Sequence, residues 1–143
     1  MTSTINNHFN TTFEDIIKDI LAVDNVMFSV RSNGAVCEVH TEKNMPLRIN
    51  EQYATIGDEL RPWHIHVNIN ETIEARFVIE NKNGNKNSYS IRFFDSKGNL
   101  ILRANFVKMY DSSNILIQEK VLKYEQLFSK HGNRYTIPLK VGK

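Results

Sequence analysis

The sequence predicts an α+β domain, in which an antiparallel β-sheet meander is accompanied by an N-terminal helix and a C-terminal helix. Apolar residues recur at helical spacing near the two ends of the chain, whereas the middle alternates apolar and polar residues between short turn sequences. Consecutive strands joined by short turns pair in antiparallel fashion, so this order indicates α+β rather than a parallel α/β sheet. With 143 residues the chain is long enough to bury its own core. We expect one domain over residues 11–132, a frayed N-terminus at 1–10, and a tail at 133–143 that could form an edge strand.

The N-terminal elements are predicted to be a short helix and a β-hairpin. The helix begins at Thr11 or Thr12, because Thr11 and Glu14 have the spacing of a capping box. Its apolar face comprises Phe13, Ile16, Ile17, Ile20 and Leu21. The hairpin pairs residues 26–30 with 35–41 around Asn33-Gly34, a dipeptide that accepts the positive φ values of a tight turn.

The rest of the chain predicts more strands and a final helix. We expect a short strand at 45–50, then a loop from Glu51 to Pro62 around Gly57. Four successive strands follow, at 63–69, 73–80, 89–94 and 100–107. The final helix is predicted over 114–130, capped by Ser112 or Ser113 and stopped by Gly132.

Charge and composition exclude several partners. The net charge is +2, but four of the 18 basic residues lie beyond the last acid, Glu125, so the first 125 residues are slightly acidic. Such a chain lacks the basic stripe that binds nucleic acid or an anionic membrane surface. Its apolar runs are too short to span a membrane. The single cysteine, Cys37, fits a cytoplasmic protein, and we expect it to be a small buried residue.

Histidines are the residues most able to carry chemistry, since the common nucleophile, phosphate-loop and zinc motifs are absent from the sequence. His64 and His66 lie two apart on a predicted strand and therefore share one face. With Glu71 they have the H-x-H-x4-E spacing of a mononuclear metal site, which is one interpretation. A second is a structural module without a ligand.

A resemblance favours a third interpretation. The pieces that carry it are Ser-Asn-Gly-Ala-Val-Cys-Glu-Val-His-Thr at 32–41, Pro-Trp-His-Ile-His-Val at 62–67 and Ser-Ile-Arg-Phe-Phe-Asp-Ser-Lys-Gly-Asn-Leu-Ile-Leu at 90–102. In their order and spacing, residues 31–132 resemble the haem-iron utilisation family, the cytoplasmic haem carriers of the ChuX/HutX/HemS type. The resemblance implies a HemS/ChuX-like fold, haem as cofactor and a role in intracellular haem trafficking or iron utilisation. An enzymatic role is not the first expectation, although haem degradation would be an extension of it.

The resemblance also implies site residues and a partner. His40 falls on a position where the family places a haem-iron ligand, and is the first choice for axial ligand, with His64 or His66 as the second ligand or a distal group. Arg61 precedes the histidine strand and is expected to bind a haem propionate. Arg76, Arg92 and Arg103 are expected to be solvated or to pair across strands. Because the chain resembles one half of longer, duplicated members, a homodimer is expected, joined through sheet edges or C-terminal strands.

Overall fold

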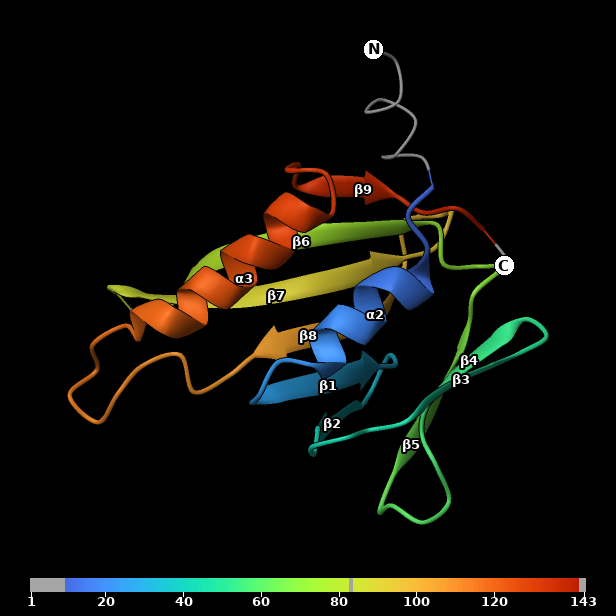
Figure 1. Ribbon diagram of the computed structural model, residues 1–143, viewed down its shortest axis with the longest axis horizontal. Coiled ribbons are helices and arrows are strands. Elements are labelled where there is room, and N and C mark those ends of the chain that lie inside the picture. Colours follow the sequence, from blue (N-terminus) through green and yellow to red (C-terminus); the bar gives the residue numbers. More distant parts are fainter. Residues whose placement is uncertain (1–9, 83, 142–143) are drawn as a thin grey trace.

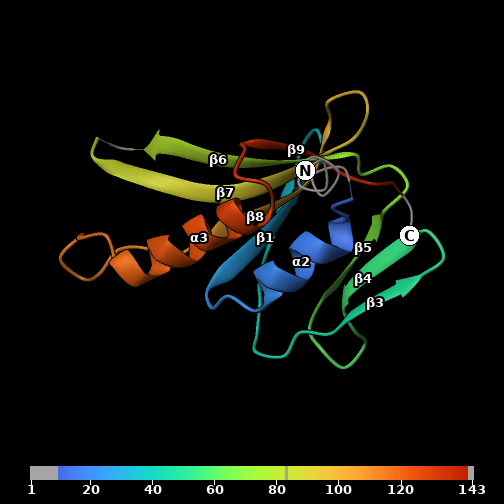
Figure 2. The ribbon, with the colours of Figure 1, turned by 45° about the horizontal axis from the view of Figure 1, so that its top comes forward.

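The computed structural model describes residues 10–82 and 84–141, which form two sheets and two helices. The larger sheet has six antiparallel strands in the order β2-β1-β8-β7-β6-β9, and the smaller has three in the order β3-β4-β5. Both helices lie on the same face of the larger sheet, and the smaller sheet lies at its β1–β2 side (Figures 1 and 2). The helices are α2 (Phe13–Leu21) and α3 (Gln118–Lys130). The strands are β1 (Val26–Arg31), β2 (Val36–His40), β3 (Leu47–Asn50), β4 (Tyr53–Gly57), β5 (His64–Asn68), β6 (Glu74–Lys82), β7 (Lys86–Phe94), β8 (Leu100–Phe106) and β9 (Thr136–Pro138). The α+β prediction is confirmed.

Helix α2 begins at the second of the two expected positions, but with a different capping box from the one predicted. Thr12, not Thr11, is the N-cap, and its Oγ1 accepts a hydrogen bond of 3.1 Å from the Asp15 backbone N–H. Asp15 Oδ2 in turn accepts from the Thr12 N–H at 2.9 Å, so Asp15 replaces Glu14 in the box. The apolar face is buried against the sheet, and Ile16, Ile17 and Ile20 are fully inaccessible to solvent. The predicted frayed segment falls, except for Asn10, outside the described residues.

The hairpin of β1 and β2 forms as predicted, with a different turn geometry. Ser32 N–H donates to Ala35 O at 2.9 Å, which closes the turn around Asn33-Gly34. Neither of these two turn residues is among the positions with positive φ. Strand β2 is an edge of the large sheet, so Cys37 is exposed, and the expectation of a buried cysteine is wrong.

The loop predicted from Glu51 to Pro62 contains a strand, β4, at the centre of the smaller sheet. In its sequence, Tyr-Ala-Thr-Ile-Gly, two of the five residues, Ala and Gly, have low β-propensity. Four of the five are buried, so the strand lacks the apolar–polar alternation of a strand with one solvent-exposed face. Strand β5 pairs with β4 rather than with β6, so the meander comprises only β6, β7 and β8. Two antiparallel sheets, one of six strands and one of three, thus replace one continuous meander.

Helix α3 begins four residues later than predicted and has no side-chain cap. Ile117 is the N-cap residue, and neither Ser112 nor Ser113 caps the helix. Instead, Asp111 Oδ1 accepts from the backbone N–H groups of Ser113 and Ile115, which holds this segment as a turn. The residues before Gln118 contain no proline or glycine and continue the helical spacing of apolar residues. The sequence therefore did not distinguish this turn from a first turn of the helix.

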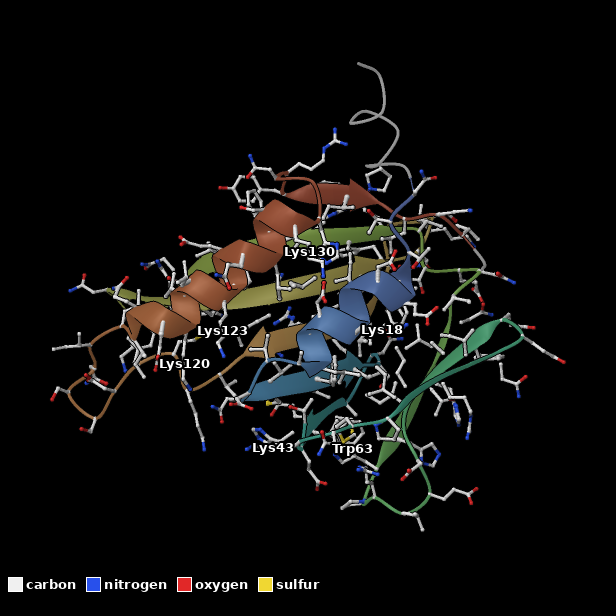
Figure 3. All side chains as sticks on the ribbon, viewed as in Figure 1. Lys18, Lys43, Trp63, Lys120, Lys123 and Lys130 are labelled. Atoms are coloured by element: carbon white, nitrogen blue, oxygen red, sulfur yellow. The ribbon has the colours of Figure 1, made fainter. Side chains whose placement is uncertain are left out.

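The far end of α3 is fastened to α2 by polar contacts. His131 Nε2 lies 2.8 Å from Asp19 Oδ2, and Lys130 Nζ lies 2.9 Å from the same oxygen. Figure 3 shows Lys130 at this junction of the two helices. His131 is 6% exposed, so Asp19 supplies the hydrogen-bond partner that a buried imidazole requires. No helix among the described residues is long and apolar enough to cross a lipid bilayer.

Candidate functional site

His64 and His66 lie side by side on the outer face of the smaller sheet. Their ring centroids are 5.0 Å apart with the planes inclined at 68°. Both side chains are exposed, whereas the alternate residues Ile65 and Val67 face the core. The shared face predicted from the two-residue spacing is therefore confirmed.

The register of the smaller sheet places an arginine and a threonine in line with His66. Thr55 on β4 is opposite both Arg48 on β3 and His66 on β5, so the three side chains share the outer face. Thr55 Oγ1 lies 2.8 Å from His66 Nδ1. With Nδ1 held by the threonine, His66 has its Nε2 free for a ligand.

Gly57 allows the close approach of β4 to β5 beside His64. The two residues are paired in register, and Gly57 has a φ of 90°. A Cβ atom at position 57 would lie 2.8 Å from Trp63 O and 3.2 Å from His64 Cα. Glycine is therefore required both by its backbone conformation and by the space available.

Two adjoining hollows cover this outer face, and both are lined by Arg48, Thr55 and His66. The first has a volume of about 430 Å³ and is also lined by His64, Asp58, Glu59 and Leu60. The second continues over Asn50, Glu51 and Tyr53. Leu60 is 92% exposed and Tyr53 43% exposed, so each hollow has an unburied apolar side chain at its rim. The site thus combines imidazoles, one guanidinium, three carboxylates and exposed apolar surface.

Arg61, the arginine expected to bind a propionate, is engaged by its own loop and by the loop between β2 and β3. Its Nη1 donates to both carboxylate oxygens of Asp58, at 3.1 and 3.2 Å, and its Nη2 donates to Asn44 O at 3.2 Å. Arg48 lines both hollows instead, and no carboxylate of the described residues lies within 4.0 Å of its guanidinium. Arg48 and Thr55 were missed from the sequence, because only the strand pairing brings them beside His66.

His40 lies apart from the other two histidines, on the larger sheet. It ends β2 opposite Met27 of β1, and its side chain is exposed on the face that the helices leave uncovered. The link to the smaller sheet is made by its backbone, since Trp63 Nε1 donates to His40 O at 3.1 Å. The Trp63 ring also packs edge-on against Phe28, with ring centroids 6.3 Å apart. His40 lines neither of the two hollows that contain His66.

Glu71 is not gathered with the histidines. Its Oε2 accepts a hydrogen bond of 2.9 Å from Asn68 Nδ2, in the turn after β5. Within residues 10–82 and 84–141, no group of three His, Cys, Asp or Glu side chains lies close enough to hold a metal ion. The H-x-H-x4-E spacing therefore does not correspond to an assembled metal centre here.

Comparison with known proteins assigns the chain to a family. One protein-family model matches residues 14–132, most of the chain. The chain belongs to the haem-iron utilisation family of the ChuX/HutX/HemS type. No curated protein matches the sequence significantly.

Solved structures of this family share the fold. A crystal structure of ChuX superposes with a TM-score of 0.71 at 16% identity, covering 85% of this chain and 73% of ChuX. A second structure, of the "Heme Binding Protein ChuX", gives a TM-score of 0.69 at 16% identity over 82% of this chain and 71% of that one. ChuS, an E. coli haem oxygenase, gives 0.66 at 19% identity over 82% of this chain but only 32% of its own length. At these identities the likeness establishes the fold of the haem-iron utilisation family, not the ligand.

Proposed function

We propose that this protein binds haem on the outer face of the smaller sheet, as a carrier in haem trafficking or iron utilisation. The observation that carries the proposal is the pair His64 and His66, which line one hollow with their rings 5.0 Å apart. Support comes from family membership and from the haem-related names of the structural neighbours ChuX and ChuS. The cytoplasmic location implied by the resemblance belongs to the same proposal.

The chemistry of the hollow fits a porphyrin. Haem iron takes a neutral imidazole nitrogen as axial ligand. The Thr55 hydroxyl oxygen can accept a hydrogen bond from His66 Nδ1–H, and in this tautomer Nε2 carries no proton and is able to bind iron. The exposed side chains of Leu60 and Tyr53 supply apolar contacts for the macrocycle. His66 is therefore the first ligand in this proposal, and His64 is its neighbour on the same face.

Arg48 is the proposed propionate partner. Arg48 on β3 and His66 on β5 are both opposite Thr55 on β4. The backbones of Arg48 and His66 are therefore two strand spacings, or roughly 10 Å, apart. A guanidinium binds a carboxylate through two parallel hydrogen bonds. Arg61 serves this role less well, because a propionate would have to displace Asp58 from it.

A haemin titration followed by the Soret absorption tests the proposal. We expect saturable binding to the wild-type protein, with the loss in His66→Ala larger than in His64→Ala. His40→Ala is the third variant to be compared, because the family resemblance implies His40 as the axial ligand. If only His40→Ala loses binding, the haem lies on the larger sheet and the hollow is not the site. If the wild-type protein shows no saturable Soret change, the haem-binding function itself is refuted.

The propionate assignment is tested separately with haemin dimethyl ester, which lacks both carboxylates. Wild-type protein should bind the ester more weakly than haemin, whereas Arg48→Gln should bind the two alike. Arg61→Gln is the matched control and should retain the wild-type preference. Equal preference in wild type and Arg48→Gln would contradict the role of Arg48.

The proposed assembly is a homodimer. The chain covers about a third of ChuS, so a second copy could supply a further domain of the same fold. Static light scattering at micromolar concentration should give twice the monomer mass of 16.6 kDa. A monomer under these conditions would contradict the dimer without affecting the haem proposal.

A further inference from the structure

The uncovered face of the larger sheet carries three arginines in one cross-strand row. Arg92 on β7 is directly opposite Arg103 on β8 and Arg76 on β6. Residues opposite each other in an antiparallel sheet point to the same face with Cβ atoms about 5 Å apart, and like charges in this relation destabilise the sheet. Figure 2 shows the two helices together on the other side of these strands. The row therefore carries an energetic cost unless acids or a bound anion compensate it.

Two of the three arginines are compensated within the chain. Arg92 Nη2 donates to Glu80 Oε1 at 2.6 Å. Arg76 forms an ion pair with Glu74, and its guanidinium lies 4.0 Å from the centre of the Phe94 ring. Each of these two arginines thus has one carboxylate partner, which offsets the repulsion between them.

Arg103 has no direct carboxylate partner among the described residues. Its Nε is buried and has no hydrogen-bond partner, and no carboxylate of residues 10–82 and 84–141 lies within 4.0 Å of its guanidinium. Burial, and next the positive charge of Arg92, lower the pKa of Arg103, while Glu80 opposes this and Arg31 adds to it. A half-buried guanidinium without an acceptor is unfavourable, since its desolvation is not repaid.

Most of the side chains around Arg103 on this face carry hydrogen-bond donors, and one acid, Glu38 on β2, lies one strand further along the row, opposite Ser29. Ser29 is directly opposite it on β1, and Arg31 lies two residues further along the same face of that strand. Asn105, two residues along β8, directs its amide Nδ2 towards Met27 O at 3.2 Å and Ser29 Oγ at 3.4 Å. Two guanidinium groups and a hydroxyl therefore face one patch of the sheet, which the Glu38 carboxylate borders on the β2 side.

We propose that this patch, Ser29, Arg31, Arg92 and Arg103, binds a small oxyanion, a carboxylate or phosphate group of a soluble molecule. The guanidinium fork matches such oxygens in two parallel hydrogen bonds. The anion supplies the acceptor that Arg103 lacks and reduces the repulsion from Arg92. This site lies on the larger sheet and is independent of haem binding on the smaller one.

Thermal unfolding in different salts tests the proposal. Wild type, Arg103→Gln and the control Arg134→Gln, an exposed arginine before β9, are compared in potassium chloride and with phosphate or acetate replacing chloride at constant ionic strength. Phosphate stabilises folded proteins generally by exclusion from their surface, so the difference between variants is the readout. We expect a saturable rise in Tm in wild type and Arg134→Gln, and only the general, non-saturating rise in Arg103→Gln. The anion that saturates at the lower concentration identifies phosphate or carboxylate as the preferred group.

Three results would overturn the proposal. The first is the same titration curve in wild type and Arg103→Gln. The second is a lower Tm of Arg103→Gln in chloride, because removal of an uncompensated charge should leave the Tm equal or higher. The third is a wild-type Tm that rises with protein concentration in chloride, together with an Arg103→Gln Tm that does not. This result would mean that a carboxylate of a second copy of the chain occupies the patch.

Discussion

Replacement of Thr55 by valine is the most direct test of how the smaller sheet prepares His66 for iron. Valine keeps the shape of threonine, so the buried position on β4, 5% exposed, retains its packing. The hydroxyl that lies 2.8 Å from His66 Nδ1 is removed. His66 is exposed, and water can replace this partner, so the free energy of unfolding should fall by only about 0.5–1.5 kcal/mol.

The effect on haem should be larger than the effect on stability. Loss of a partner that orients a ligating imidazole costs about 10–100-fold in affinity, or roughly 1.4–2.7 kcal/mol. A Soret titration with haemin measures this affinity, and urea unfolding measures stability. Thr55→Ser is the matched control, because it retains the hydroxyl and should bind haemin within a few-fold of wild type.

The result that refutes this reasoning is unchanged haemin affinity in a folded Thr55→Val protein. It would mean that His66 does not bind the iron, or that the threonine does not orient it. A parallel loss of affinity in Thr55→Ser would instead indicate that the packing of β4, and not the hydroxyl, matters.

Three further substitutions test other parts of the structure. A residue other than glycine at a positive φ costs about 1–3 kcal/mol in backbone strain alone. Gly57→Ala should lower the free energy of unfolding by more than this, since the new Cβ also meets Trp63 O. Gly98→Ala, with a φ of 82° but open space around its Cβ, measures the backbone cost alone, and equal losses in the two would contradict the steric argument. Asp19→Ala should lower the free energy of unfolding by about 1–3 kcal/mol, because it leaves the buried His131 without its partner. Lys130→Ala removes only an exposed amine, so its free energy of unfolding, measured in urea, should be nearly that of wild type. The hydrogen bond and charge of Arg92 lower the pKa of Glu80, so this carboxylate stabilises the fold above about pH 4.5, and the effect is lost as the pH falls through the lowered value. Glu80→Gln should therefore lose less stability than wild type on acidification, and steeper acid sensitivity in the variant would refute the pairing.

Local patterns predicted the elements whose signals are contained in a few consecutive residues. Helix α2, the β1–β2 hairpin and the shared face of His64 and His66 were confirmed, because 3.6-residue and two-residue periods are set by backbone geometry alone. The capping box was displaced by one residue to Thr12. Strand β4 was missed because four of its five residues are buried and its sequence carries no apolar–polar alternation.

The pairing of strands was decided only by the tertiary structure. A strand's sequence shows which residues share a face, but not which strand lies beside it or in which register, since both depend on burial of the whole apolar surface. Pairing of β5 with β4 separated His64 and His66 from His40 and brought Arg48 and Thr55 beside them. Pairing of β7 with β6 and β8 aligned Arg76, Arg92 and Arg103 in one row, where the sequence had indicated solvated or cross-strand arginines. The sequence by itself therefore determined the α+β class, the family resemblance and the histidine pair, whereas the neighbours that give those side chains their chemistry were set by contacts between distant segments.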